Sequence, residues 1–193
     1  MNGSHVRYWF PKPYADRVAR LRVPFGFLLL VTFAWLSQPT PESILWGLPF
    51  CALGLSIRAW AAGHLAKNRE LATSGPYAYI RNPLYAGTLI AAAGIVVAAR
   101  DLALAVVFAA IFLLVYLPVI ELEEQHLREI FPGYNAYARS IHRLLPLRKW
   151  PQRGSSFSWP LYLHNEEYKA LIGFLIALAW LILKSWWLRH KAA

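Results

Sequence analysis

Five apolar runs, of which the first and third are shorter than a membrane-spanning helix, restrict the fold of this chain more than any other feature. A helix needs about 20 apolar residues to cross the hydrocarbon core of a bilayer. The chain is 58% hydrophobic and 16% charged, whereas a soluble domain carries about 25% charged residues. The runs cover residues 23–36, 44–62, 84–99, 102–120 and 168–187. We therefore predict an all-α integral membrane bundle of about five transmembrane helices.

The polar stretches between these runs suggest how the chain is organised. Only Arg100 and Asp101 interrupt the apolar sequence from 84 to 120, which indicates a tight helical hairpin. The first run lacks the small-residue cleavage pattern of a signal peptide, so we expect a retained helix. We predict a single membrane domain over residues 1–193, with a basic N-terminal segment at 1–22, four membrane helices within 23–120, a cytoplasmic helical polar block at 121–150 and the last helix at 168–188.

The net charge of +10 is concentrated in three clusters. The clusters contain Arg7, Lys12, Arg17, Arg20 and Arg22; His64, Lys67, Arg69 and Arg81; and Arg128, Arg139, Arg143, Arg148, Lys149 and Arg153. The positive-inside rule places all three on the cytoplasmic side, and we expect the plasma (inner) membrane. Such a face attracts anionic membrane lipids. No soluble basic domain is evident that would bind nucleic acid.

The C-terminal basic residues conflict with this orientation. Lys184, Arg189 and Lys191 fall on the opposite side if the last helix spans the membrane. Either the earlier charges set the orientation, or the last helix does not cross.

Two polar islands interrupt the apolar sequence, and both predict a ligand site. The first island, residues 73–87, combines three tyrosines, an arginine, two prolines and two glycines at the entrance of an apolar helix. The second island, residues 121–146, first continues a helix and is broken at Pro132-Gly133. A short helix then aligns Tyr134, Tyr137 and Ile141. Polar groups near hydrocarbon are costly unless they pair or face a water-filled site.

Each candidate residue has a functional and a structural interpretation. Glu121 and Glu124 share a helix face and suit a cationic ligand, but Glu124 is also placed to pair with Arg128 four residues on. Arg81 suits a carboxylate or phosphate, or it lies at the membrane surface as an interfacial arginine. His64 is either a ligand or a helix cap.

The remaining residues of the first island are equally open. Gly75 and Pro76 either let the backbone approach a ligand or only turn the chain. Tyr77, Tyr79 and Tyr85 are either site walls or interfacial aromatics. Cys51 is a small packing residue, and no cysteine–histidine cluster indicates a metal site.

Both islands match the signatures of one enzyme superfamily. Residues 75–87 read Gly-Pro-Tyr-Ala-Tyr-Ile-Arg-Asn-Pro-Leu-Tyr-Ala-Gly. They resemble the Gly-Pro-Tyr-x-Tyr-x-Arg-His-Pro-x-Tyr-x-Gly signature of the isoprenylcysteine carboxyl methyltransferase and phospholipid methyltransferase superfamily. The resemblance continues to residue 147 with Glu123-Glu124, then Leu127, Phe131, Tyr134, Tyr137, Arg143 and Pro146, which match the second signature.

The resemblance implies a membrane methyltransferase that uses S-adenosylmethionine. Its cofactor pocket would lie at the cytoplasmic ends of the helices, closed by the polar block, and a lipophilic acceptor would enter from the bilayer. The predicted catalytic residues are Arg81, Glu124 and Tyr85. The predicted cofactor-binding residues are His64, Lys67, Gly75, Pro76, Tyr77, Arg81, Asn82, Pro83, Tyr85, Glu123, Glu124, Tyr137 and Arg143.

The chain departs from the superfamily pattern at four places. Asn82 replaces the histidine of the Arg-His-Pro triplet, so this position cannot titrate. No arginine lies in residues 112–120, before the glutamate pair, which disfavours a prenylcysteine carboxylate as the acceptor. The spacing from Phe131 to Tyr134 is one residue shorter, and the last helix lies beyond the signatures.

Two other functions fit parts of the sequence. Membrane sterol reductases resemble the same Arg-His-Pro region and use NADPH, but they are usually longer. A non-catalytic protein could retain the fold for lipid binding, although the presence of both islands argues against it.

Overall fold

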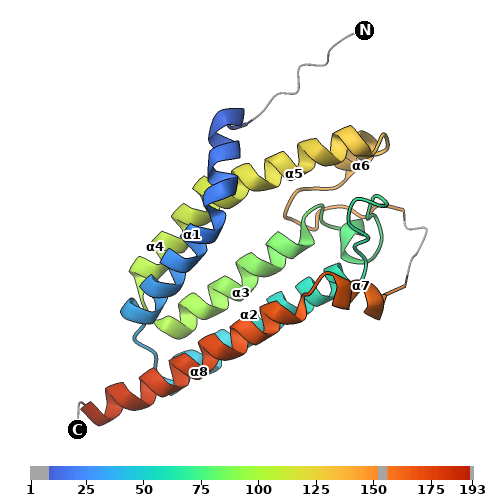
Figure 1. Cartoon of the computed structure of the whole chain (residues 1–193). Helices are drawn as coiled ribbons and strands as arrows, with labels where there is room; N and C mark the ends of the chain where they lie inside the picture. The colour runs from blue at the N-terminus through green and yellow to red at the C-terminus, as the bar shows by residue number, and fades with distance from the viewer. Residues whose placement is uncertain (1–8, 152–155, 192–193) are drawn as a thin grey trace.

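The computed structural model of the chain describes residues 9–151 and 156–191, and within these ranges it contains helices and no strand (Figure 1). Arg7 and Arg153 of the predicted basic clusters lie outside the described residues. The helices are α1 Lys12–Leu36, α2 Pro41–Ala62, the 3-10 helix η1 Gly75–Ala78, α3 Pro83–Ala99, α4 Leu102–Ile111, the π-helical turn η2 Phe112–Tyr116, α5 Leu117–Ile130, α6 Tyr134–Ser140, α7 Trp159–His164 and α8 Tyr168–Lys191.

The prediction of an all-α membrane protein is confirmed. Among the described residues, three continuous helical segments are long and apolar enough to cross a membrane: Pro41–Ala62, Leu102–Ile130 and Tyr168–Lys191. The bent helix α1 is a fourth when its halves, Lys12–Leu21 and Val23–Leu36, count as one span. The apolar helix α3 has 17 residues and is shorter than these.

Helix α1 begins at Lys12, eleven residues before the apolar run that predicted it. Its polar half is helical because Ala15 and Val18 are buried, and Val18 packs with Ile111 and Val115. The two halves meet at a bend of 55°, next to Pro24, which lacks an N–H and crowds the preceding turn.

Helices α2 and α3 pack backbone to backbone through small residues. A Cβ at Gly94 would lie 2.6 Å from the Cys51 sulfur, and a Cβ at Gly54 would lie 2.5 Å from the backbone nitrogen of Ala91. Small residues allow such an approach between helices in a membrane. This packing places the C-terminal end of α2 beside the N-terminal end of α3, which contains the last residues of the first island.

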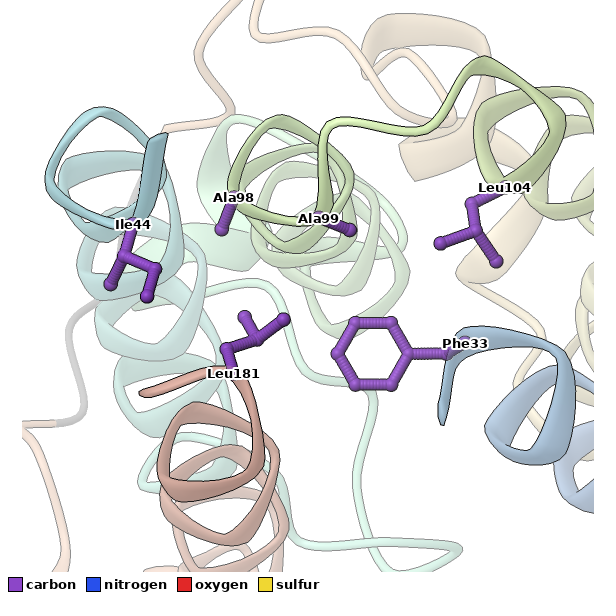
Figure 2. Close-up of a cluster of buried hydrophobic side chains, with 6 residues drawn as sticks. All are labelled: Phe33, Ile44, Ala98, Ala99, Leu104 and Leu181. Atoms are coloured by element: carbon purple, nitrogen blue, oxygen red, sulfur yellow. The ribbon is translucent and has the colours of Figure 1, made fainter. Parts of the chain in front are cut away.

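Helix α8 runs the length of the bundle beside α2, and its C-terminus lies at the end away from the polar segments (Figure 1). At that end, Leu181 packs with five buried residues of α1–α4: Phe33, Ile44, Ala98, Ala99 and Leu104 (Figure 2). The Lys184 ammonium donates to the carbonyl oxygens of Ala34 and Trp35 at 2.8 Å each, which caps α1. The C-terminal end of α8 therefore lies at the end of the bundle opposite the islands.

Candidate functional site

Glu124 of α5 joins the two islands through a buried cluster of four side chains. Its side chain is 1% exposed and accepts a bidentate pair from Arg143, with Nε–Oε1 at 3.2 Å and Nη2–Oε2 at 2.9 Å. Asn82 Nδ2 donates to Glu124 Oε1 at 2.8 Å, and Arg81 Nη1 lies 3.3 Å from Oε2. This Glu124 cluster (Arg81, Asn82, Glu124 and Arg143) carries two positive charges and one negative charge.

The pairing of Glu124 with Arg128 does not occur. Arg128 instead donates to Asn135 Oδ1, and its guanidinium lies 5.2 Å from the centre of the Tyr134 ring. Helical spacing allowed either partner for Glu124, but burial selects the two arginines, because an unpaired buried carboxylate would be costly.

Backbone hydrogen bonds hold the islands side by side. The N–H groups of Arg81 and Asn82 donate to the carbonyl oxygens of His142 and Arg143 at 2.9 and 3.1 Å. The Tyr137 hydroxyl donates to the carbonyl oxygen of Tyr77 at 2.6 Å. Burial raises the pKa of Tyr137, so this hydroxyl keeps the proton that it donates.

A cavity of about 400 Å³, here called the polar-end cavity, opens beside the Glu124 cluster. Eight of the predicted site residues line it: Lys67, Tyr77, Arg81, Asn82, Pro83, Tyr85, Glu123 and Tyr137. The Tyr85 hydroxyl donates to Glu123 Oε1 at 3.0 Å. Arg81 Nε is buried and has no hydrogen-bond partner among the described residues. Arg81 and Glu123 thus bring a cationic and an anionic side chain to the cavity lining.

The other predicted site residues lie behind the wall. Glu124 and Arg143 hold Arg81 and Asn82 in place without lining the cavity. His64, Gly75 and Pro76 form a packed corner. His64 Nδ1 is 2.9 Å from the Trp60 carbonyl oxygen, and a Cβ at Gly75 would lie 2.6 Å from the His64 ring. Gly75 also has a φ of +58°, which favours glycine.

A second cavity of about 360 Å³, here called the bundle cavity, lies among α1, α2, α3, α4, η2 and α8. Its lining is apolar except for Arg58, Thr88 and Tyr116. Tyr116 lines the bundle cavity and Tyr85 lines the polar-end cavity, and the centres of their rings are 6.3 Å apart. The two cavities are therefore neighbours.

Several residues around these sites were absent from the predicted site residues. The sequence grouped Glu121 with Glu124 as a partner for a cationic ligand. In the structure Glu121 is buried and accepts from the backbone N–H groups of Trp9 and Phe10 at 2.6 and 3.2 Å. Arg58 pairs with Glu167, and a lone arginine inside the apolar run 44–62 was a second signal. Leu71 and His126 line the polar-end cavity without a distinct sequence signal, whereas Phe131, which also lines it, belongs to the second signature.

A known protein family matches the part of the chain that contains the first island and the start of the second. The model of the phospholipid methyltransferase family matches residues 46–133, from within α2 to just beyond α5. This match confirms the superfamily resemblance and includes the whole first island and the glutamate pair.

Two curated relatives also match. The chain is 36% identical to the cobalt-zinc-cadmium resistance protein CzcN of Cupriavidus metallidurans over 121 residues, which are 60% of this chain and 55% of that protein. It is 31% identical to the nickel-cobalt-cadmium resistance protein NccN of Alcaligenes xylosoxydans xylosoxydans over 114 residues, 58% of this chain and 52% of that protein. The chain thus matches about half the length of these relatives. No solved structure matches.

Proposed function

We propose that this chain, which belongs to the phospholipid methyltransferase family of membrane methyltransferases, transfers a methyl group from S-adenosylmethionine to a lipophilic acceptor. One observation carries the proposal. Residues of the first island line one cavity, and Glu124 and Arg143, which are distant in the sequence, bind them from behind. A second, apolar cavity adjoins the first. The polar-end cavity would then hold the cofactor, and the bundle cavity would hold the acceptor.

The residues at the polar-end cavity fit the cofactor. Its volume lies within the range of about 300–1,000 Å³ typical of small-molecule sites. The net positive Glu124 cluster, whose Arg81 lines the cavity, suits the carboxylate of S-adenosylmethionine. Glu123 and the tyrosine rings suit its ammonium and sulfonium groups. The apolar side chains Leu71, Leu127 and Phe131 suit the adenine.

The contribution of the protein to methyl transfer would be mainly positioning. When bound, the cofactor would supply a methyl group activated by its sulfonium. A lone pair of the acceptor would bond to the methyl carbon as the carbon–sulfur bond breaks, and S-adenosylhomocysteine would be the leaving group. Arg81 would bind the cofactor carboxylate, and Glu124 would position Arg81 from behind. Tyr85 lies between the two cavities and would orient the acceptor against the methyl group, which lowers the barrier through proximity. The surrounding apolar walls would exclude water.

The acceptor would be an uncharged or cationic amphiphile drawn from the bilayer. The bundle cavity is walled by residues of both apolar runs of the predicted hairpin, 84–99 and 102–120. No arginine in 112–120 is available for a carboxylate-ended acceptor. From the distribution of basic residues, we place the cofactor site on the cytoplasmic side of the plasma (inner) membrane.

A cofactor-binding experiment tests the proposal. We expect S-adenosylhomocysteine, and not NADPH, to raise the unfolding midpoint of the purified protein in lipid nanodiscs, because a ligand of the native state stabilises it. Methyl-labelled S-adenosylmethionine, incubated with the protein and its host membranes, should then label a lipid fraction. Stabilisation by NADPH would instead support the reductase. A protein that binds neither cofactor would support a non-catalytic lipid-binding role.

A further inference from the structure

Arg143 belongs to the Glu124 cluster but has no helix to hold it. It lies beyond the family match, in the irregular segment that follows α6. Its guanidinium nevertheless donates two hydrogen bonds to Glu124, and only 17% of its side chain is exposed. Ordering a long arginine side chain costs rotamer entropy. Further contacts are therefore needed to keep Arg143 in the orientation that engages Glu124.

Trp9 supplies such a contact. Arg143 Cζ lies over the Trp9 ring, 4.7 Å from its centre, which is within the range of a cation–π interaction. This contact is compatible with the hydrogen bonds to Glu124, because the N–H groups donate in the plane of the guanidinium while the cation is attracted to the face of the ring. Trp9 does not line the polar-end cavity. It can therefore influence a ligand in that cavity only through other residues.

Glu121 fixes the backbone that carries Trp9. The Glu121 carboxylate is buried in α5, and its two oxygens accept from the consecutive N–H groups of Trp9 and Phe10 at 2.6 and 3.2 Å. A carboxylate that accepts from backbone N–H groups forms charge-assisted hydrogen bonds, which are stronger than neutral ones. This buried carboxylate thus has a use that the proposed reaction does not explain.

Tyr14 makes a second attachment to the same continuous helical segment. Its hydroxyl donates to the carbonyl oxygen of Leu114 at 2.6 Å. Pro118 lies four residues beyond Leu114 and has no N–H to donate to this carbonyl, so the tyrosine takes the place of a helical donor. Residues 9–14, here called the N-terminal strap, are therefore attached on both sides of Pro118.

We propose that the N-terminal strap positions Arg143 for cofactor binding, with Trp9 as the positioning residue and Glu121 as the anchor of the strap. This inference rests on the proposed function. Trp9 would hold Arg143 in the orientation that keeps Glu124 behind Arg81. Without the indole this arrangement would be populated less, and the apparent affinity of a ligand falls by the fraction lost. The cofactor site would then depend on a segment that precedes the family-matched residues.

Substitutions of Trp9 test the proposal with little risk to the fold, because this residue is 76% exposed. Calorimetric titration of the full chain in lipid nanodiscs measures the affinity for S-adenosylhomocysteine. Trp9→Leu should weaken it about two- to fivefold, as expected for an exposed cation–π contact. Trp9→Phe keeps an aromatic ring and should restore most of the affinity. Trp35→Leu is the matched control, because Trp35 is 83% exposed at the opposite end of α1 and should bind like the wild type.

A double-mutant cycle separates positioning from membrane anchoring. If Trp9 acts through Arg143, Trp9→Leu should have no further effect on affinity in an Arg143→Gln background. A tryptophan that only anchors the chain at the membrane surface would lower affinity equally in both backgrounds. That result, or equal effects of Trp9→Leu and Trp35→Leu, would overturn the inference. The same cycle is run on the unfolding midpoint without ligand, where additive changes would count against the contact.

Glu121→Gln shifts the affinity in opposite directions for the two roles that Glu121 could have. Loss of a negative charge alone would make the surroundings of Arg81 more positive and strengthen the binding of a ligand carboxylate. Loss of the anchor would release the strap and weaken binding, which we expect, by about as much as Trp9→Leu. Faster hydrogen exchange in residues 9–14 should accompany it. A higher affinity for S-adenosylhomocysteine, or unchanged exchange, would overturn the inference.

The two proposals fail in distinguishable ways. If the wild type does not bind S-adenosylhomocysteine, the proposed function fails, and the strap positions no cofactor site. If the wild type binds it and Trp9→Leu binds it equally well, only the inference about the strap fails.

Discussion

Glu124 and Glu167 are both buried carboxylates paired with arginine, yet their surroundings differ in one respect. Glu124 lies between two arginines and an asparagine, so its cluster retains a net positive charge and the unpartnered Arg81 Nε. Glu167 has one arginine, and four hydrogen bonds engage that arginine. The net positive charge of the first cluster suits an anionic ligand. In the second, the arginine charge is matched by Glu167, and the pair attaches α8 to α2. The comparison distinguishes a candidate ligand site, which has a net positive charge and lines a cavity, from an ion pair that attaches a helix.

The largest effect is expected at Glu124. Glu124→Gln removes the charge between two half-buried arginines and should lower the free energy of unfolding by about 3 kcal/mol, because two positive charges then lie together without a compensating carboxylate. A lowered unfolding midpoint without any ligand would show this. Glu123→Gln is the control, because Glu123 is exposed at the cavity. Equal midpoints for the two variants would contradict the central role of Glu124.

Arg81→Ala should weaken ligand binding more than it lowers stability. The loss of a charge-assisted contact costs about 1.5–3 kcal/mol, so the affinity for S-adenosylhomocysteine should fall about tenfold or more. Glu124 keeps Arg143 and Asn82 in this variant, so the unfolding midpoint should change less than in Glu124→Gln. Calorimetric titration measures the affinity, with Arg81→Lys as a partial rescue. Unchanged affinity in Arg81→Ala would mean that this guanidinium does not face the ligand.

Glu167→Gln should lower stability without weakening ligand binding. Arg58 retains Leu84 and Thr88 as partners and is partly exposed, so we expect a smaller loss of stability, about 1–2 kcal/mol. Affinity for S-adenosylhomocysteine should stay at the wild-type level, because Glu167 does not line the polar-end cavity. Protease sensitivity near the start of α8 would report its detachment. A strong loss of affinity for S-adenosylhomocysteine would instead show that the Arg58–Glu167 ion pair also contributes to ligand binding.

The smallest effect is expected for Asn82→His. Asn82 donates to Glu124 from its amide, and a histidine ring nitrogen can donate at similar reach. Both stability and affinity for S-adenosylhomocysteine should change less than in the other three variants. A folded variant that no longer binds the ligand would show that the amide itself shapes the cavity.

The sequence alone determined the features that depend on local signals. The apolar runs predicted the C-terminal ends of α1, α2 and α3 at residues 36, 62 and 99. Pro132-Gly133 correctly separated α5 from α6. Tyr134, Tyr137 and Ile141 are buried together, as their helical spacing predicted. Each signal needs only a few neighbouring residues, because helix breaking and helical periodicity are local properties.

Only the tertiary structure decided which polar groups meet. Helical spacing offered Glu124 the nearby Arg128, but folding brings it to Asn82, 42 residues away, and to Arg81 and Arg143. Arg58 and Glu167 are separated by 109 residues and meet only because α8 runs back along α2. Partner choice for a buried charge depends on which segments exclude water around it, and distant helices determine that exclusion. Spacing along one helix therefore cannot predict it.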